Sequence, residues 1–380
     1  SNMRQARFLA LWAALAIGVF GCLRAFGATV TVPPQQSIAS AIANAAAGDT
    51  LVIQASTRNE SLVVNKSIIV KAESPGAVTL RPGGYTAVSI QCSNCGVSGF
   101  VAENFEQAVS GTGRSNVTIQ DMKFTNAGAG IWINGGDDWT VERVDLEFHA
   151  RDGEDYLNVL SGSGHTFRRL FFYGLKPEML LEPDGTYKHN DCIQTWVSGG
   201  TTGLKDTIIE ECIFTDFAQG TYLHNEDGTA NAINGITIRN CVFWGVDFPR
   251  SGGVWPSHGT RLTGPSSIAH VVKNNLYKHI SNNLRLNNLG SAVTTEGNII
   301  FDAGAVYSLV ATTPNKGTLG NLVWSADNMG GVAAPDKTNI DPQVRNAAAT
   351  GLAVLGPDGL MFTEDDAWRP TNPQAALYGP

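Results

Sequence analysis

Charged residues, cysteines and helical patterns are all scarce in this sequence of 380 residues. Only 16% of the residues are charged, and the formal net charge is −8. This acidic balance disfavours nucleic acid as a partner. Of the six cysteines, Cys22 lies in the N-terminal segment that is read below as a leader, and the remaining five, an odd number, provide no disulfide framework. Because no second Cys-x-x-Cys and no histidine lies at ligand spacing from Cys92 and Cys95, a zinc site is not expected, whereas a local disulfide between these two remains open.

Long hydrophobic runs are also few, and the clearest one, Phe8 to Phe20, follows two arginines near the N-terminus. A cationic segment followed by an apolar run of this length is typical of a signal peptide, and the run is too short for a transmembrane helix. We therefore predict a leader at residues 1–27, with an expression remnant at residues 1–2, and no membrane span in the mature chain. The protein is expected to be secreted or periplasmic, with lipid anchoring at Cys22 as the less favoured alternative.

Short strand-like segments between turn residues fill most of the remaining chain, and only one helix is expected. Ser37 is a suitable N-cap, Ile38 and Ile42 belong to an apolar face, and Gly48 can end a helix that spans Ser37 to Ala47. Loss of the three arginines in the leader would take the net charge of the chain from −8 to −11. The mature protein is therefore expected to be a markedly acidic, strand-rich chain.

Two motifs after this helix identify a family resemblance. The helix is followed by a Gly-Asp-Thr motif, a strand and an Asn-Lys-Ser-Ile motif, at Gly48-Asp49-Thr50 and Asn65-Lys66-Ser67-Ile68. This order resembles the N-terminal cap of the pectin-lyase-like right-handed parallel β-helix superfamily. The resemblance implies a solenoid of short parallel strands.

From about residue 88 the sequence repeats itself, which predicts the same architecture independently. The first strand of each repeat has apolar residues at spacings of three and two: Ile119-Met122-Phe124, Val141-Val144-Leu146, Phe167-Leu170-Phe172, Ile209-Cys212-Phe214, Ile238-Cys241-Phe243 and Val272-Asn275-Tyr277. A second strand follows each of them. Because no repeat can bury its apolar face alone, the repeats must stack. We predict an all-β, right-handed parallel β-helix (solenoid) with a short N-terminal capping helix.

The repeat pattern also divides the chain. Residues 28–87 form the cap and the first coils, 88–320 the parallel β-helix coils, and 321–380 a C-terminal coil and cap segment that is expected to cover the last coil. Cys212 and Cys241 occupy equivalent positions in neighbouring coils and are expected to stack in the core rather than to form a disulfide. Two long insertions, at 173–188 and 246–257, enter the second strand from the same side, where binding sites are commonly built.

Side chains alternate between the two faces of a strand, so the second strands predict columns of outward-facing residues. The first column is Trp132, Asn158, Gln194, Tyr222, Arg261, Arg285 and Tyr307, and the second is Asn134, Leu160, Trp196, His224, Thr263, Asn287 and Leu309. The turn position just before each strand gives Asp155, Asp191, Gln219, His258 and Asn282.

These columns place aromatic, amide and cationic groups together. Aromatic side chains stack on sugar rings, and arginine and lysine bind carboxylates. The expected partner is an acidic, uronate-containing polysaccharide. Its predicted binding residues are Trp132, Asn158, Gln194, Trp196, Tyr222, Trp255 and Arg285.

The order of polar motifs resembles that of polygalacturonase-type hydrolases, with three matches and three departures. Asp155, Asp191 and Arg261 match the family pattern. The departures are an asparagine in place of the first Asp of the Asp-Asp pair, a glutamine in place of the His and a threonine in place of the Lys, at Asn190, Gln219 and Thr263. In that family the replaced Asp is the proton donor, and an asparagine cannot protonate a leaving group. Hydrolysis is therefore the less favoured reaction.

The favoured reaction is β-elimination, in which a base removes the C5 proton of a uronate. Asp155 and Asp191 are predicted to hold calcium, and no organic cofactor is expected. The candidate bases are Arg261 and Lys188, with His258 or His224 as proton donor or alternative base. Three alternatives stay open: a glycoside hydrolase, a uronate C5-epimerase on the same fold, and a non-catalytic glycan-binding or adhesion protein.

Overall fold

We analysed a computed structural model that describes residues 27–82, 84–148, 155–176, 190–197, 203–245, 258–287, 289, 293–310, 314–328 and most of 332–380. The predicted leader, including Cys22, lies outside these residues except for Gly27, and so do Lys188 and Trp255. Among the described residues, no helix is both long and apolar enough to cross a bilayer.

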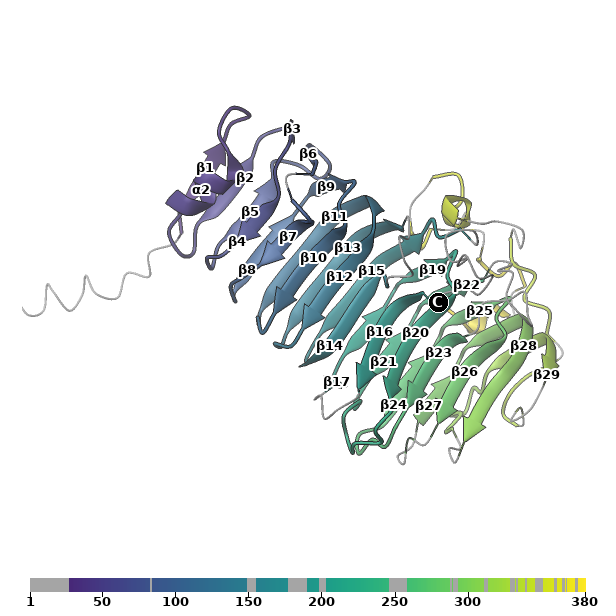
Figure 1. Ribbon diagram of the computed structural model, residues 1–380. Coiled ribbons are helices and arrows are strands. Elements are labelled where there is room, and N and C mark those ends of the chain that lie inside the picture. Colours follow the sequence, from purple (N-terminus) through teal and green to yellow (C-terminus); the bar gives the residue numbers. More distant parts are fainter. Residues whose placement is uncertain are drawn as a thin grey trace, which may run out of the picture.

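The chain winds into a right-handed solenoid whose strands stack in parallel, from the capping helix α2 (Ile38–Asn44) to the last strand (Figure 1). Each complete coil contributes one strand to each of three faces, here called faces A, B and C. Face A contains β1 (Thr29–Val32), β2 (Thr50–Ile53), β5 (Ile69–Ala72), β8 (Cys95–Ser98), β11 (Val117–Ala127), β13 (Trp139–Phe148), β15 (Thr166–Tyr173), β18 (Ile208–Glu210), β21 (Thr237–Arg239), β24 (His270–Lys273) and β27 (Val293–Glu296).

Face B begins with β3 (Ser56–Arg58), β6 (Val78–Leu80) and β9 (Phe100–Glu103), continues through the second halves of β11, β13 and β15, and ends with β19 (Ile213–Thr215), β22 (Val242–Trp244), β25 (Leu276–Lys278), β28 (Ile299–Val310) and β29 (Leu322–Asn328). Face C contains β4 (Leu62–Val64), β7 (Thr86–Ile90), β10 (Gln107–Thr112), β12 (Ala129–Asn134), β14 (Leu157–Ser163), β16 (Asp191–Val197), β20 (Gln219–Asn225), β23 (His258–Thr263), β26 (Asn282–Asn287) and the second half of β28. The short β17 (Gly203–Lys205) pairs with the end of β14.

The capping helix is confirmed, although it ends earlier than expected. Ser37 is the N-cap, and its side chain accepts a hydrogen bond from the backbone N–H of Ser40. The helix ends at Asn44 because the carboxylate of Asp49 binds the next free backbone N–H, that of Ala46, at 2.8 Å. The same carboxylate accepts from the N–H of Ala28 at 2.7 Å and so ties the first strand to the cap.

The spacing of three and two in the sequence repeat reflects a bend between faces A and B. In the coil that starts at Ile119, the residue at the bend is Asp121, whose φ is +53°, and Arg143 has the same φ one coil further on. A residue with left-handed φ and ψ bends the chain at this corner of the coil. Because of the bend, the apolar residue that follows it points inward again. The triplets are in register from coil to coil, as Ile119 pairs with Val141 and Phe124 with Leu146.

The core confirms the stacking of equivalent residues. Four aromatic rings stack along one column, Phe172, Phe214, Phe243 and Tyr277, with centroids 4.4 to 4.9 Å apart. Cys212 and Cys241 lie side by side in the core as free thiols, as the sequence predicted. Cys92 and Cys95 are free and buried as well, so the possible disulfide between them is not formed.

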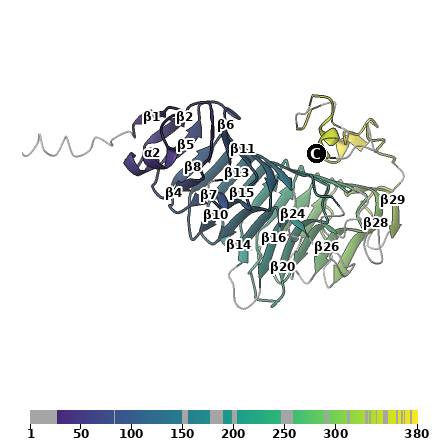
Figure 2. The same cartoon turned by 45° about the horizontal axis from the view of Figure 1, so that its top comes forward.

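The C-terminal segment contacts both the last coil and face B. Its residues near Lys337 do reach the last coil, where Lys337 exchanges backbone hydrogen bonds with Val323 and Asn321. The later part, however, lies beside face B rather than over the end of the solenoid, as Figure 2 shows for the yellow segment. There, side chains such as Trp368 and Tyr378 cover an outward apolar column: Phe171, Ile213, Val242, Leu276, Ile299 and Leu322. The column needs this cover because it would otherwise be an exposed apolar patch.

Two buried histidines are expected to make the solenoid less stable in acid. His165 and His270 are fully buried, and Nδ1 of each accepts a hydrogen bond from a backbone N–H of the preceding coil, that of Trp139 or Ile236, at 3.2 Å. Burial lowers the pKa of each histidine from 6.5 to about 4. As pH falls below 6.5, the unfolded chain binds these protons and the folded chain does not. Stability is therefore lost between these two pKa values, by about 3 kcal/mol for each histidine.

Urea unfolding at about pH 7 and about pH 4.5 measures this loss of stability. The double variant His165→Gln, His270→Gln keeps an acceptor for each N–H and removes both titrations. It is expected to lose distinctly less stability between the two pH values than the unmodified protein. An equal loss in both proteins would mean that other groups cause the acid sensitivity.

Candidate functional site

The outward side of face C carries the predicted polar column. In the structure Trp132 pairs with Asn158, Asn158 with Gln194, Gln194 with Tyr222, Tyr222 with Arg261 and Arg261 with Arg285, on strands β12, β14, β16, β20, β23 and β26. The turn column is also in register, since Asp191 pairs with Gln219, Gln219 with His258 and His258 with Asn282.

The ends of the predicted columns are wrong. Arg285 pairs with Ser308 and Leu284 with Tyr307, so the backbone register at this end differs by one residue from the predicted column. Leu160 leaves the second column because a register shift on β12 and β14 pairs Asn134 with Ser161. Asn287 pairs with Val310 rather than Leu309. Alternation cannot reveal such one-residue shifts, because they change the face of every residue that follows.

One end of the site is a hydrogen-bonded cluster of two carboxylates and two amides on β14, on β16 and just before β14. The backbone N–H of Asp191 donates to Oδ1 of Asp155 at 2.9 Å. Gln194 Nε2 donates to Oδ2 of Asp191 at 2.7 Å, and Asn158 Nδ2 donates to Oδ2 of Asp155 at 3.3 Å and to Oε1 of Gln194 at 3.0 Å. Asp191 is completely buried. The two amides therefore stand in front of the two carboxylates, on the outward side.

The same cluster contains the two carboxylates at which calcium was predicted. Calcium takes six to eight oxygen ligands. Three carboxylate oxygens in the cluster accept hydrogen bonds from N–H groups. Within the described ranges, no group of three or more His, Cys, Asp or Glu side chains could hold a metal ion. Calcium at Asp155 and Asp191 thus stays a prediction, and we derive no step from it.

The other end of the site is cationic. The guanidinium of Arg261 lies 4.3 Å above the ring of Tyr222, and Arg285 is its neighbour on the next coil. Neither arginine forms an ion pair with a described residue, and Nε of each is buried without a hydrogen-bond partner there. Other arginines do form ion pairs: Arg169 with Glu211 at 2.7 Å, and Arg239 with Glu210 at 2.6 Å. Burial and the charge of Arg285 lower the pKa of Arg261.

His258 is held between two neighbours and supports the cationic end. Its Nε2 lies 2.8 Å from Nη1 of Arg285, and its Nδ1 lies 3.2 Å from Oε1 of Gln219. A guanidinium can only donate, so Nε2 accepts, and an amide oxygen can only accept, so Nδ1 carries the proton. These two contacts place the ring of His258 between Gln219 and Arg285. Its role as proton donor or base stays a prediction.

A second group of rings lies beside Arg261. The hydroxyl of Tyr222 lies 3.3 Å from Nδ1 of His224, and the half-exposed Trp196 packs edge-on against His224 with ring centroids 5.6 Å apart. Burial, followed by the charge of Arg261, lowers the pKa of His224. Burial raises the pKa of Tyr222. At neutral pH the imidazole is therefore neutral and the phenol is protonated.

Sequence reasoning missed Glu226. Its Oε2 accepts a hydrogen bond from Nε1 of Trp196 at 3.0 Å and so fixes the indole that faces outward. Glu226 follows the strand β20 and has no equivalent in the predicted columns. The sequence contains one signal for this contact. Glu226 lies two residues after His224, and His224 is paired with Trp196 of the preceding coil.

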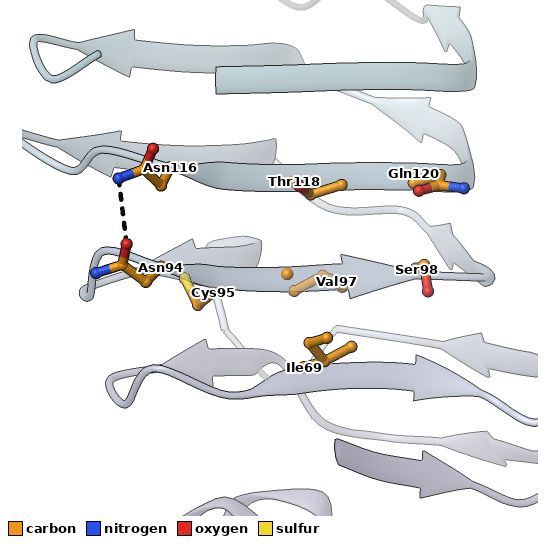
Figure 3. A pocket seen from close by; sticks show the side chains of 9 residues that line it. Ile69, Asn94, Cys95, Val97, Ser98, Asn116, Thr118 and Gln120 are labelled. Carbon is orange, nitrogen blue, oxygen red and sulfur yellow. Dashed lines mark hydrogen bonds between the residues drawn. The ribbon is translucent and has the colours of Figure 1, made fainter. Parts of the chain in front are cut away.

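A separate pocket of about 310 Å³ lies on face A, over β5, β8 and β11 (Figure 3). Its lining includes the half-exposed Ile69 and two asparagines, Asn94 and Asn116, whose amides are hydrogen-bonded to each other at 3.1 Å. Gly96 forms its floor between Ile69 and Thr118, with which it is in register. The pocket holds no ionisable group except the buried thiol of Cys95, so it offers no acid–base chemistry comparable to that of face C.

The geometry defines a parallel β-solenoid with a polar, partly cationic surface on one face. A family model described as the right handed beta helix region matches residues 107–346, so the chain belongs to this family. No curated protein matches the sequence.

Solved structures with related folds share little sequence with this chain. Pectate lyase Pel9A has a TM-score of 0.51 at 13% identity, over 91% of this chain and 89% of that one. A rhamnogalacturonan lyase gives 0.47 at 12% identity, over 93% and 99%. The A-module of the mannuronan C-5 epimerase AlgE4 from Azotobacter vinelandii gives 0.44 at 10% identity, over 87% and 91%. At these identities the likeness concerns the fold alone.

Proposed function

We propose that this protein is a carbohydrate-active enzyme that cleaves a uronate-containing polysaccharide by β-elimination, and that it is exported as its leader pattern indicates. The observation that carries the proposal is the pair of neighbouring guanidinium groups, Arg261 and Arg285, which have no acidic partner among the described residues. A uronate carboxylate fits such a pair, because guanidinium groups bind carboxylates in a bidentate manner. The exposed indole of Trp196 supplies a surface for a sugar ring.

The neighbouring rings provide the acid–base groups of the reaction. His224 is neutral at neutral pH and takes the C5 proton as general base. The electron pair of that C–H bond forms the C4–C5 double bond, and the bond from C4 to the glycosidic oxygen breaks. The leaving oxygen takes a proton from Tyr222, which burial keeps protonated. Arg261 and Arg285 stabilise the negative charge that develops on the carboxylate.

This assignment differs in part from the roles that the sequence favoured. A guanidinium keeps its proton in proteins, so Arg261 is better suited to charge stabilisation than to proton abstraction. Lys188 lies outside the described residues. Hydrolysis receives little support, because Asn190 stands where the related hydrolases have their proton donor and is completely buried. A glycan-binding protein without activity is the second candidate, since the same aromatic and cationic groups would serve binding alone.

Incubation of the purified protein with a panel of polyuronates tests the proposal. Elimination gives a product with a C4–C5 double bond, which absorbs in the ultraviolet. New reducing ends without this absorbance would indicate hydrolysis. An altered uronate composition without cleavage would indicate epimerisation. Binding without any change in the polymer would leave only the glycan-binding function.

A further inference from the structure

A glycine interrupts a regular column of outward-facing residues on face A. The members of this column are in register from coil to coil, and from Thr50 to Thr294 every one except Gly96 is threonine, isoleucine or valine. The neighbours of Gly96 in the column are Ile69 on β5 and Thr118 on β11. β-branched residues fit the pleated surface of a sheet, whereas a glycine inside a strand weakens the strand. Gly96 therefore needs a reason of its own.

The usual structural reasons for a glycine inside a strand do not apply to Gly96. Such a glycine marks a bend, a β-bulge, or a close approach of another backbone or of a ligand. The φ of Gly96 lies outside the left-handed region, and Cys95 and Gly96 pair with Val117 and Thr118 without a register shift. A Cβ atom at Gly96 would have the backbone oxygen of Thr118, 3.5 Å away, as its nearest neighbour. Among the described glycines outside the left-handed region, no other has as much space. The close approach of a ligand is the reason that remains.

The missing side chain leaves the pocket of about 310 Å³ on face A (Figure 3). Ile69, which is 47% exposed, forms one wall. Asn94 and Asn116 lie at one end of the pocket, and Ser98 and Gln120 lie at the other (Figure 3). The two asparagines have φ values of +55° and +56°, a conformation that asparagine adopts more readily than most residues. The pocket thus combines an aliphatic wall with amide and hydroxyl groups at both ends.

This lining fits an uncharged sugar unit. The lining residues fall within 69–120, of which only residue 83 lies outside the described part of the chain, and none of them has a charged side chain. Burial raises the pKa of the Cys95 thiol, which is therefore neutral. An ionised ligand would lose water here without gaining an opposite charge. Amides and hydroxyls both donate and accept hydrogen bonds, as the hydroxyl groups of a sugar do. The aliphatic wall complements the C–H groups of a sugar ring.

We propose that the pocket at Gly96 is a non-catalytic binding site that takes one uncharged sugar unit of a glycan. Its size agrees, because ligand pockets span about 300 to 1,000 Å³ and this one is at the lower end. Five coil steps, from β8 to β21, separate Gly96 from the coil of Arg261, which is about 24 Å along the axis. The site is therefore separate from the acid–base groups of face C. It goes beyond the proposed function, because it requires no cleavage of the glycan.

The substitution Gly96→Thr tests the proposal, since it inserts a side chain that the column carries elsewhere. A Cβ atom has room at this position, so thermal unfolding should give an equal or higher Tm than that of the unmodified protein. The probes are the methyl glycosides of glucose, galactose, mannose and rhamnose, titrated by ligand-observed NMR. At least one of them is expected to bind the unmodified protein, and Gly96→Thr should raise its Kd by at least about ten-fold. A lower Tm in the variant would show that Gly96 serves the fold and would overturn the proposal.

Two further variants distinguish a blocked pocket from a general defect. The double variant Ser98→Ala, Gln120→Ala keeps the space and removes polar groups, so its Kd should also rise by at least about ten-fold. Thr237→Val is the matched control, because Thr237 lies in the same outward column on the coil of Arg261, and its Kd should be unchanged. The absence of binding by every glycoside, or an equal Kd in all four proteins, would contradict the proposal. A dimer that Gly96→Thr dissociates in analytical ultracentrifugation would assign the pocket to a second copy of the chain instead.

Galacturonate and glucuronate serve as charged comparison ligands. Their binding should be the same in Gly96→Thr as in the unmodified protein, and a loss equal to that of the neutral glycoside would overturn the choice of an uncharged ligand. Gly96→Thr should cleave a short uronate oligosaccharide at the unmodified rate, and Arg261→Ala should bind the neutral glycoside with an unchanged Kd. Absence of cleavage with the pocket still binding would overturn the proposed function alone. Cleavage without binding at the pocket would overturn this inference alone.

Discussion

Replacement of His224 by glutamine is expected to lower kcat for polymer cleavage by about 10²- to 10⁴-fold, the usual contribution of a general base. Glutamine keeps a polar group within reach of the Tyr222 hydroxyl, which lies 3.3 Å from Nδ1 of His224, and it cannot accept the C5 proton as an imidazole does. The fold should be unaffected because His224 points outward from β20 and is only half-buried. Steady-state kinetics on the best polymer, with thermal unfolding as the check on folding, measures the effect.

The pH profile distinguishes a base from a merely structural residue. Because burial and the charge of Arg261 lower the pKa of His224, kcat should rise with pH along a limb centred below pH 6.5. This limb should be absent from the residual activity of His224→Gln. Wild-type activity that first rises well above neutral pH would contradict the assignment and return the role of base to a lysine or arginine. Gln194→Glu is not a suitable control, because it would add charge to the acidic cluster.

Replacement of Arg261 by alanine is expected to lower kcat/KM by about 10²- to 10³-fold, as the loss of one charge-stabilising donor does in other active sites. The guanidinium lies at 4.3 Å over the Tyr222 ring, beside Arg285, where a carboxylate would be bound by both groups. Arg261→Lys keeps the charge but not the planar fork, so its kcat/KM should lie between those of the wild type and Arg261→Ala.

The same variant has a second readout that a structural defect would not mimic. Removal of Arg261 removes a positive charge that lowers the pKa of His224. The acid limb of the pH profile should therefore move toward higher pH in Arg261→Ala, and back again in Arg261→Lys. An unchanged limb together with unchanged turnover would show that Arg261 takes no part in the reaction.

The fold could be predicted because each coil repeats the same burial pattern. Ile119 and Phe124 mark the inward positions of one coil in the sequence. In the structure, the equivalent residues of the following coils are paired in register with them. The bend itself could not be predicted, since residues with positive φ such as Asp121 and Arg143 are charged and lack the usual glycine signature. The sequence did indicate where the C-terminal segment packs. Ile213, Val242 and Leu276 are apolar and directly follow inward-facing residues, so they form a second, outward apolar face that needs a cover.

The site could be predicted only as far as strict alternation holds. The columns are correct from Trp132 to Arg285 and fail at Tyr307, where the register shifts by one residue. The contact between His258 and Arg285 joins two different columns and depends on side-chain conformation, which sequence periodicity does not contain. That contact places the imidazole of His258 directly against the guanidinium of Arg285, an arrangement that the predicted columns did not contain.

Mass analysis of the products tests the central claim most directly. A defined uronate-containing oligosaccharide is incubated with the purified protein, and the masses of the two fragments are added. Elimination introduces no atoms, so the fragment masses should sum to the mass of the intact oligosaccharide, with the double bond on the fragment that carried C4. A sum that exceeds it by one water molecule would establish hydrolysis, and the absence of fragments from every uronate-containing substrate would leave binding without catalysis; either result would contradict this account.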